Sequence, residues 1–149
     1  MRRAAVMVVA LAALAGACAR SKTTYRVETP SFHSAGPGAT EELQSVLDSQ
    51  AASIGGADWR SLYDQFVPSE RSRCSYDQFL RSATGIFGPL HDQAGSSALA
   101  AQVSRVQVSG FRASVDYKFV LPASGLASPA QSAHYLKVGD RWYIDEKAC

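Results

Sequence analysis

The sequence lacks several features that would place it in common functional classes. Its longest apolar run, Ala4–Leu14, is well short of the roughly 20 residues that a membrane-spanning helix needs. It has no glycine-rich phosphate-binding loop and no nucleophile motif, and its histidines (His33, His91 and His134) show no metal-ligand spacing with its cysteines. A formal net charge of only +2 offers no basic surface for nucleic acid. We therefore expect no metal, no cofactor and no nucleic-acid partner.

The beginning of the chain has the pattern of an export signal. Arg2 and Arg3 precede the apolar run, and small residues then lead to Cys18. This stretch resembles the signal peptide and lipobox of bacterial lipoproteins, in which the cysteine sulfur carries acyl chains such as palmitate. The resemblance implies that residues 1–17 are removed and that a lipid on Cys18 holds the protein on a membrane, outside the cytoplasm. A secretory peptide cut nearby, with Cys18 incidental, is the alternative.

Two further cysteines, Cys74 and Cys149, are the only others in the chain. An even pair in an exported domain most simply forms one disulfide. This bond would join the C-terminal residue to the helical region and close a loop of about 75 residues, which contributes roughly 4 kcal/mol in the chain-entropy model. Two free thiols are the other possibility.

The remainder divides into a linker and one domain. Residues 18–38 are polar and contain Ser, Thr, Pro and Gly throughout, so we expect a flexible tether. Residues 39–149 are long enough for a single domain. Thr40 is expected to cap its first helix, which Gly55-Gly56 ends.

Two more helices are expected before the strands begin. Asp58 can cap a helix with an apolar face at i, i+3, i+4 and i+7, formed by Trp59, Leu62, Tyr63 and Phe66. Pro68 should stop this helix, and residues 69–73 would be a charged connection. Ser75 and Gln78 form a capping-box pattern that opens a third helix. Gly85, Gly88 and Pro89 should break it, leaving residues 90–97 as a loop or an irregular strand.

A strong strand signal covers residues 103–120. On the second half, apolar and polar residues alternate with the period of two that a half-buried strand requires, the apolar set being Phe111, Ala113, Val115, Tyr117 and Phe119. The apolar phase shifts at Ser109-Gly110. We expect a two-residue turn there, which pairs Val108 with Phe111.

Two last strands, over residues 130–138 and 142–145, have an ambiguous register. A two-residue turn pairs Val138 with Arg141 and sets His134 opposite Asp145. A three-residue loop pairs Val138 with Trp142, turns His134 inward and gathers the apolar residues on one face. We prefer the three-residue loop, because register follows the buried face.

Helices followed by antiparallel strands indicate an α+β fold. Several stretches resemble the nuclear-transport-factor-2-like superfamily, in which helices cover a strongly curved sheet to form a cone; they are residues 40–54, 59–66, 76–80, 106–119 and 135–144. The chain is also similar to small lipoproteins of high-GC bacteria, which have a signal, a tether and one such domain. The resemblance implies N-terminal helices packed on a curved antiparallel sheet.

The resemblance also implies a pocket at the open end of the cone. Its implied lining is Tyr63, Phe66, Tyr117, Phe119, His134 and Trp142. Aromatic walls with a few polar tips suit a small, largely apolar ligand. The alternative is that the same residues fill a closed core.

Three classes of function follow. The first is a non-catalytic, membrane-anchored domain that binds a small apolar ligand or an envelope protein, and we prefer it. The second is a pocket enzyme of the isomerase, dehydratase or hydrolase type found among relatives, for which only His134 and Tyr117 are candidate acid–base groups and no carboxylate lies on an apolar face. The third is a module that docks a partner or a second copy through the outer sheet face, which would carry Arg112, Ser114, Asp116, Lys118, Tyr135 and Tyr143.

Overall fold

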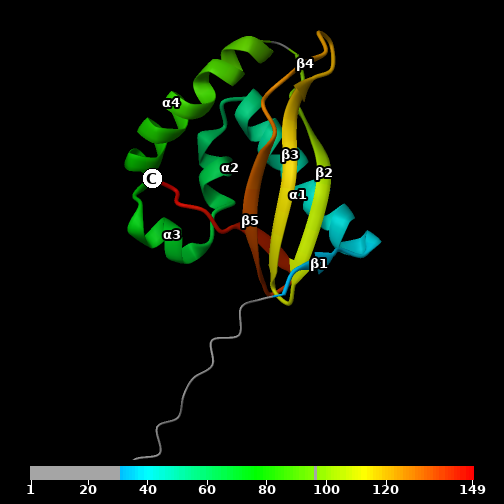
Figure 1. The fold of residues 1–149 in the computed structure, drawn as a ribbon. Helices are drawn as coiled ribbons and strands as arrows, with labels where there is room; N and C mark the ends of the chain where they lie inside the picture. The colour runs from blue at the N-terminus through cyan, green and yellow to red at the C-terminus, as the bar shows by residue number, and fades with distance from the viewer. Residues whose placement is uncertain (1–30, 96) are drawn as a thin grey trace, which may run out of the picture.

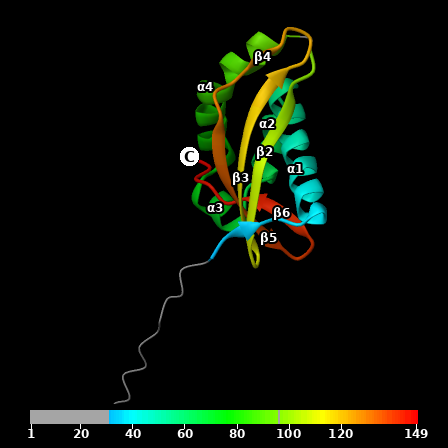
Figure 2. The same ribbon diagram turned by 45° about the vertical axis from the view of Figure 1, so that its right-hand side comes forward.

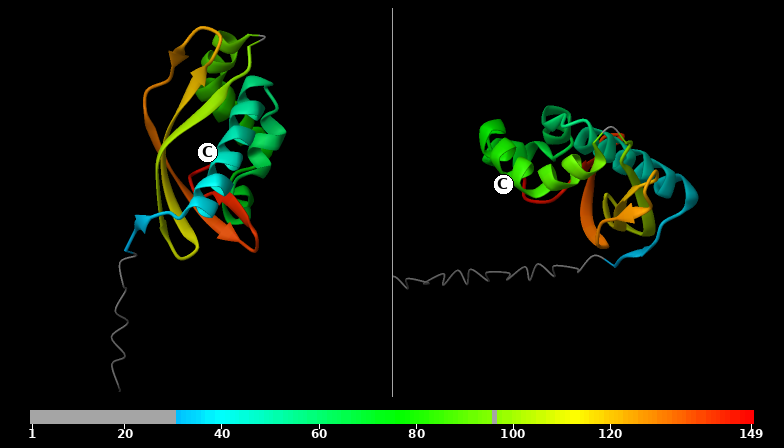
Figure 3. Two further views of the ribbon diagram at one scale, coloured as in Figure 1. Left: turned by 90° about the vertical axis from the view of Figure 1, so that its right-hand side faces the viewer. Right: turned by 90° about the horizontal axis from the view of Figure 1, so that it is seen from above.

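The computed structural model describes residues 31–95 and 97–149, so the predicted signal peptide and Cys18 lie outside the described residues. Within this part of the chain, helices pack against one side of a curved antiparallel sheet (Figures 1 and 3). The helices are α1 (Pro37–Gly55), α2 (Trp59–Asp64), α3 (Pro68–Arg73) and α4 (Tyr76–Ala94). The strands are β1 (His33–Ser34), β2 (Ala100–Ser109), β3 (Arg112–Leu121), β4 (Leu126–Ala127), β5 (Gln131–Val138) and β6 (Arg141–Ile144). The predicted α+β class is confirmed.

The sheet has the order β1-β2-β3-β5-β6, with the short β4 paired to β3. Each pairing is antiparallel, and the long central strand β3 contacts β2, β4 and β5. The core lies between the inner face of these strands and the helices. No helix among the described residues is both long enough and apolar enough to span a membrane.

Helix α1 begins earlier than predicted. Gly36 is its N-cap and Pro37 its first residue, a position that suits proline because the missing N–H has no helical partner there. Thr40 is therefore inside the first turn and not the cap, and its hydroxyl donates to the Gly36 carbonyl at 3.1 Å. Together with β1, this turn occupies residues that we expected in the tether.

The second helix begins as predicted, because the Asp58 carboxylate accepts from the backbone N–H of Ser61 at 3.0 Å. Its end differs from the prediction. The helix stops at Asp64, and Pro68 occupies the first turn of a separate helix, α3, where residues 69–73 were expected to be a connection. Proline is favourable in the first turn of a helix, so Pro68 can begin α3 as well as prevent α2 from continuing.

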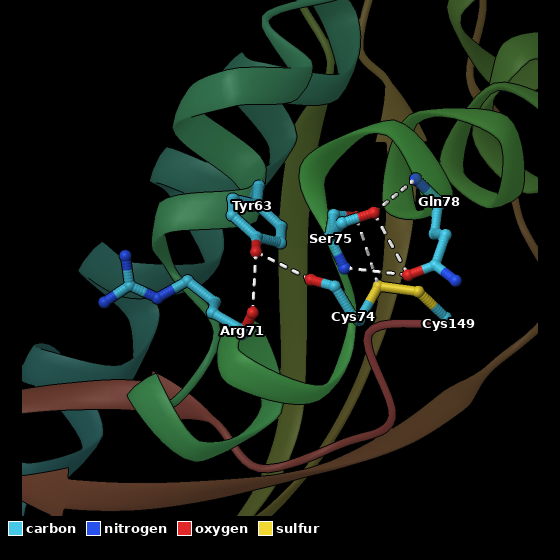
Figure 4. Close-up of a disulfide and its surroundings, with 6 residues drawn as sticks. All are labelled: Tyr63, Arg71, Cys74, Ser75, Gln78 and Cys149. Atoms are coloured by element: carbon cyan, nitrogen blue, oxygen red, sulfur yellow. Dashed lines mark hydrogen bonds between the residues drawn. A yellow bond between two sulfur atoms is a disulfide. The ribbon is translucent and has the colours of Figure 1, made fainter.

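Helix α4 opens with the predicted capping box between Ser75 and Gln78, drawn in Figure 4. It then continues through Gly85, Gly88 and Pro89 to Ala94, so the predicted break is wrong. Tertiary contacts hold the later turns in place: the His91 ring nitrogen Nδ1 lies 2.9 Å from the Gly55 carbonyl oxygen. Such contacts can override the local cost of proline and glycine.

The β2–β3 hairpin has the predicted buried face but a different turn. Ser109 pairs with Arg112 and Val108 with Ala113, so the loop is Gly110-Phe111. Gly110 has φ +59° at the first loop position, which is what a type II′ turn requires. Phe111 is consequently 72% exposed at the turn. A register shift between Val103 and Arg105 places Ala101 and Val103, opposite Phe119 and Tyr117, on the same face as Val106 and Val108.

The β5–β6 hairpin adopts the register that we rejected. Val138 pairs with Arg141 across the loop Gly139-Asp140, and Gly139 has φ +61°. The three-residue prediction is therefore wrong. The buried face is set by the neighbouring strand, because Tyr135 lies opposite Ala113 on the interior side of β3. Val138 and His134 are exposed as a result.

The C-terminal residues run from β6 to the start of α4. Cys149 forms the predicted disulfide with Cys74, with their Cα atoms 5.8 Å apart. In Figures 1 and 2 the C-terminus lies beside the connection between α3 and α4. The disulfide thus fixes the final segment across the gap between the sheet and α4.

Candidate functional site: a cavity beneath α4

A cavity of about 250 Å³ lies between α4 and the inner face of the sheet. Helix α4 packs mainly on α1 and α2 and has little direct contact with the strands. The C-terminal segment after β6 closes one end of the cavity. The wall is mostly apolar, and its main side chains are Ile54, Leu62, Phe66, Phe79, Ala83, Ile86, Phe87, Tyr117, Phe119, Ala133, Ile144 and Ala148.

Three of the side chains that we expected to line a pocket meet in this cavity. Phe66 follows α2, while Tyr117 and Phe119 point inward from β3. The rings of Tyr117 and Phe119 contact edge to face with centroids 5.3 Å apart, and Phe66 meets Phe79 of α4 at 5.5 Å. Edge-to-face pairs of this kind hold aromatic walls in defined orientations.

Tyr117 also supplies one of the few polar groups of the cavity. Its hydroxyl lies 3.4 Å from Oε1 of Gln131, to which it donates. Burial raises the pKa of Tyr117, and the nearby negative charge of Glu146 raises it further. The phenol is therefore a weaker acid than free tyrosine and is neutral at physiological pH. Its single proton is directed at Gln131, so the hydroxyl oxygen can accept a hydrogen bond from a ligand.

A second polar pair at the cavity was missed in the sequence analysis. Gln50 of α1 donates from Nε2 to the hydroxyl of Tyr135 at 3.1 Å, and the two residues are 5% and 0% exposed. Burial is the main cause of the raised pKa of Tyr135. We had placed Tyr135 on the outer face, which the observed register contradicts. Gln50 could have been found, because it follows Leu43 and Leu47 on the buried stripe of α1.

His134 is not a lining residue, because the observed β5–β6 register turns it outward. Its Nδ1 lies 2.7 Å from Oε1 of Glu146, and the same oxygen accepts from the His134 backbone N–H at 2.9 Å. Glu146 thus accepts a hydrogen bond from the backbone of β5 at a position beyond the end of β6. Glu146 and the next residue, Lys147, both contribute to the rim of the cavity.

Tyr63 lies outside the cavity and has a structural role. Its hydroxyl is 2.9 Å from the Arg71 carbonyl oxygen and 2.7 Å from that of Cys74 (Figure 4). A single phenolic proton is shared between these two acceptors. Tyr63 therefore fixes the α3–α4 connection that carries the disulfide.

Trp142 lies in a different hollow, an open cleft of about 440 Å³ between α1 and β6. Its indole N–H donates to Oε2 of Glu42 at 2.7 Å, and Lys137 donates to the same oxygen at 2.7 Å. These hydrogen bonds lower the pKa of Glu42, that from Lys137 most. Although Trp142 is buried as expected, it belongs to this polar cleft and not to the cavity.

The outer face of the sheet has mixed charge. Arg105 lies 3.5 Å from Asp116, and Arg112 lies 3.6 Å from Asp145. Ser132 donates to Asp116 at 2.6 Å. Because Tyr135 points inward, this face does not present the pair of tyrosines that would have favoured a docking surface.

No protein-family model matches the chain, and no curated protein is similar to it in sequence. One similar solved structure is the crystal structure of a candidate dehydratase of the NTF2-like family from Streptomyces avermitilis. It is 13% identical, with a TM-score of 0.45, and the match covers 73% of this chain and 93% of that chain. A similarity of this degree assigns neither an activity nor a residue role to this chain.

Proposed function

We propose that this domain binds a small, largely apolar molecule in the cavity beneath α4, without transforming it. The supporting observation is the cavity itself, which has aromatic and aliphatic walls and a few polar groups at its edge. Ligand pockets are typically apolar hollows in which a small number of polar groups fix orientation. The hydroxyl of Tyr117 is the polar group best placed to do this.

The chemistry of the lining favours binding over catalysis. A general acid or base works best with a pKa near the operating pH, whereas burial moves the pKa of Tyr117 and of Tyr135 upward, away from neutrality. Glu146 is occupied by His134 and by a backbone N–H. A binding role needs only the neutral phenol and the apolar walls.

The location that we propose is the outer side of a membrane, with a lipid on Cys18. This part of the proposal is supported by the sequence pattern of residues 2–18 alone. Metabolic labelling with an alkyne-bearing palmitate would test it: wild type should be labelled, and Cys18→Ala should lose both the label and the membrane association. An unlabelled wild-type protein would contradict the anchor and leave the cavity proposal untouched.

The cavity proposal is tested by filling the space. Ala83 is buried on α4 and lines the cavity, so Ala83→Phe should occupy the volume that a ligand needs. Native mass spectrometry of the detergent-extracted full chain should show a bound small molecule in wild type and none in Ala83→Phe. Ala52→Phe is the matched control, because Ala52 is an exposed position on α1.

The converse results would contradict this function. A wild-type chain without bound mass that also fails to bind apolar probes would show that the cavity is not a ligand site. Bound mass retained in Ala83→Phe would place the ligand elsewhere. If Ala83→Phe does not fold, Tyr117→Phe provides a milder change that should weaken the binding of any ligand that donates a hydrogen bond to the Tyr117 hydroxyl.

A further inference from the structure

The cavity adjoins an apolar groove that lies farther along α4. This groove, of about 290 Å³, lies between the later turns of α4 and the β3–β5 connection that contains β4. Ile86 and Phe119 line both the cavity and the groove. The other residues of the groove are Pro89, Leu90, Gln93, Leu121, Leu126, Ala127, Ser128 and Pro129. The two hollows therefore adjoin each other beneath a single helix, and we refer to them together as the path.

The groove exposes large apolar side chains that face each other across it. Ile86 of α4 is 67% exposed and Leu126 of β4 is 58% exposed. By contrast, Phe111 and Val138 are exposed at or beside hairpin turns and line neither hollow. Leaving two such side chains on opposite walls of one groove costs solvation free energy, which a covering apolar ligand would recover.

The polar atoms of the groove are largely engaged within the protein. The Ser128 hydroxyl accepts from the Phe119 backbone N–H at 3.0 Å and donates to the Pro129 carbonyl at 2.9 Å. Gln93, at the far end, is the remaining polar side chain of the lining. The groove can therefore recognise a ligand almost entirely through apolar contact.

The shape of the path favours a linear ligand. The lining residues of α4 recur about once per turn, at Phe79, Ala83, Ile86 and Leu90. From Ser82 to Gln93 the helix axis extends for roughly 16 Å at about 1.5 Å per residue. A compact molecule would fill only the cavity, whereas an extended chain can contact both hollows.

The inner end of the path offers a cation. Lys147 lies on the cavity rim and forms no salt bridge within residues 31–95 and 97–149. Its neighbour Glu146 is engaged by His134. An anionic group at this end can therefore pair with Lys147, which has no salt-bridge partner among the described residues, while the neighbouring Glu146 carboxylate is held by His134.

From these observations we propose that the ligand is a single-chain amphiphile with a carboxylate head, such as a long-chain fatty acid. The carboxylate lies at Lys147, and the alkyl chain runs through the cavity into the groove at Leu126. This inference rests on the proposed binding function of the cavity and adds the class and orientation of the ligand.

Chain length provides the first test. Octanoate, dodecanoate and hexadecanoate are titrated into the full chain below their micelle concentrations, with displacement of a fluorescent fatty acid as the readout. Affinity should rise by about fourfold per added methylene while each one is buried. Leu126→Asp should weaken hexadecanoate binding by at least about tenfold and leave octanoate unchanged, and Val138→Asp, at another exposed apolar position, should change neither.

The head group provides the second test. Lys147→Met should weaken dodecanoate binding and leave dodecanol binding unchanged, because only the acid carries the charge that Lys147 pairs with. Equal losses for the two probes would overturn the assignment of the carboxylate to Lys147.

The outcomes separate this inference from the function on which it rests. If octanoate binds as tightly as hexadecanoate and Leu126→Asp has no effect, the groove proposal fails while the cavity remains a binding site. If neither the acids nor dodecanol bind, yet native mass spectrometry shows bound mass that Ala83→Phe removes, the amphiphile proposal is wrong and the cavity proposal stands. If neither probe binding nor bound mass is observed, both the amphiphile proposal and the cavity proposal are wrong.

Discussion

Two hollows in the described part of the chain differ in character, the cavity beneath α4 and the polar cleft between α1 and β6. The cleft is the larger, about 440 Å³ against about 250 Å³. Its central groups bond to one another, since Glu42 accepts from both Lys137 and Trp142. The cavity has apolar walls and, at its rim, Lys147, which has no salt-bridge partner among the residues that the structure describes. If the cavity binds a ligand as proposed, the state of the lining polar groups is a better guide to the site than its size.

This difference has an energetic origin. In the cleft, hydrogen bonds between side chains hold α1 on the end of the sheet, so opening the cleft would leave those groups without partners. In the cavity, apolar surfaces that do not meet leave dispersion contacts unmade. A ligand can supply those contacts. The first hollow thus serves the fold, and the second is available for binding.

The largest loss of stability is expected from breaking the disulfide that holds the C-terminal segment at one end of the cavity. Cys149→Ser opens the disulfide that closes a separation of 75 residues, and this should cost roughly 4 kcal/mol of unfolding free energy in the chain-entropy model. Urea unfolding followed by circular dichroism measures this loss. Wild type treated with a reductant should behave like Cys149→Ser, and an unchanged midpoint in both would contradict the prediction.

The buried pair beside the cavity should have the next largest effect. Tyr135→Phe removes the hydroxyl that Gln50 contacts at 3.1 Å and leaves a buried amide unsatisfied, at a cost of about 1–3 kcal/mol. In Gln50→Leu/Tyr135→Phe both polar partners are replaced, so stability should partly return. A double-mutant cycle in urea measures the coupling. Additive losses in the double variant would show that the two side chains do not depend on each other.

In the polar cleft, Glu42→Gln should destabilise the protein by less than Tyr135→Phe, because Glu42 is half exposed. The hydrogen bonds from Lys137 and Trp142 lower the pKa of Glu42. The stabilisation is therefore present above the ordinary carboxylate pKa of 4.5 and is lost as the pH falls through the lowered value. Unfolding curves for wild type and Glu42→Gln should converge in acid. A difference that persists below that range would contradict a charge effect.

The smallest effect concerns the phenol of the cavity. The raised pKa of Tyr117 means that the unfolded chain loses this proton first. Stability should therefore fall as the pH rises above about 10, the ordinary value for tyrosine. Tyr117→Phe should show a shallower decline than wild type between neutral and alkaline pH. Parallel declines would show that Tyr117 is not the group responsible.

Several elements were predictable because their signals are local. The Ser75–Gln78 capping box and the Asp58 cap depend on residues within one turn. The inward face of β3 follows from its alternation alone, and Ala113, Val115, Tyr117 and Phe119 are all buried. Tyr117 and Phe119, two of the residues that meet in the cavity, lie on this alternating face.

Other features could not be read locally. The inward face of β5 depended on its neighbour: Tyr135 and Leu136 are both large and apolar, and only pairing with β3 decides which of them is buried. That choice displaced His134 from the predicted lining. Similarly, the glycines and proline of α4 argue for a break, and the contact between His91 and Gly55 maintains the helix.

The sequence by itself determined that helices precede antiparallel strands, the caps at Asp58 and Ser75, and the buried face of β3, because each depends on short-range pattern. The even pair of cysteines favoured the bond between Cys74 and Cys149 by a simple count. Only the tertiary structure decided the turn registers, the length of α4 and the existence of a hollow beneath it. The hollow depends on the separation between α4 and the sheet. This separation is set by the packing of α4 on α1 and α2 and by the disulfide that holds the C-terminal segment near the start of α4.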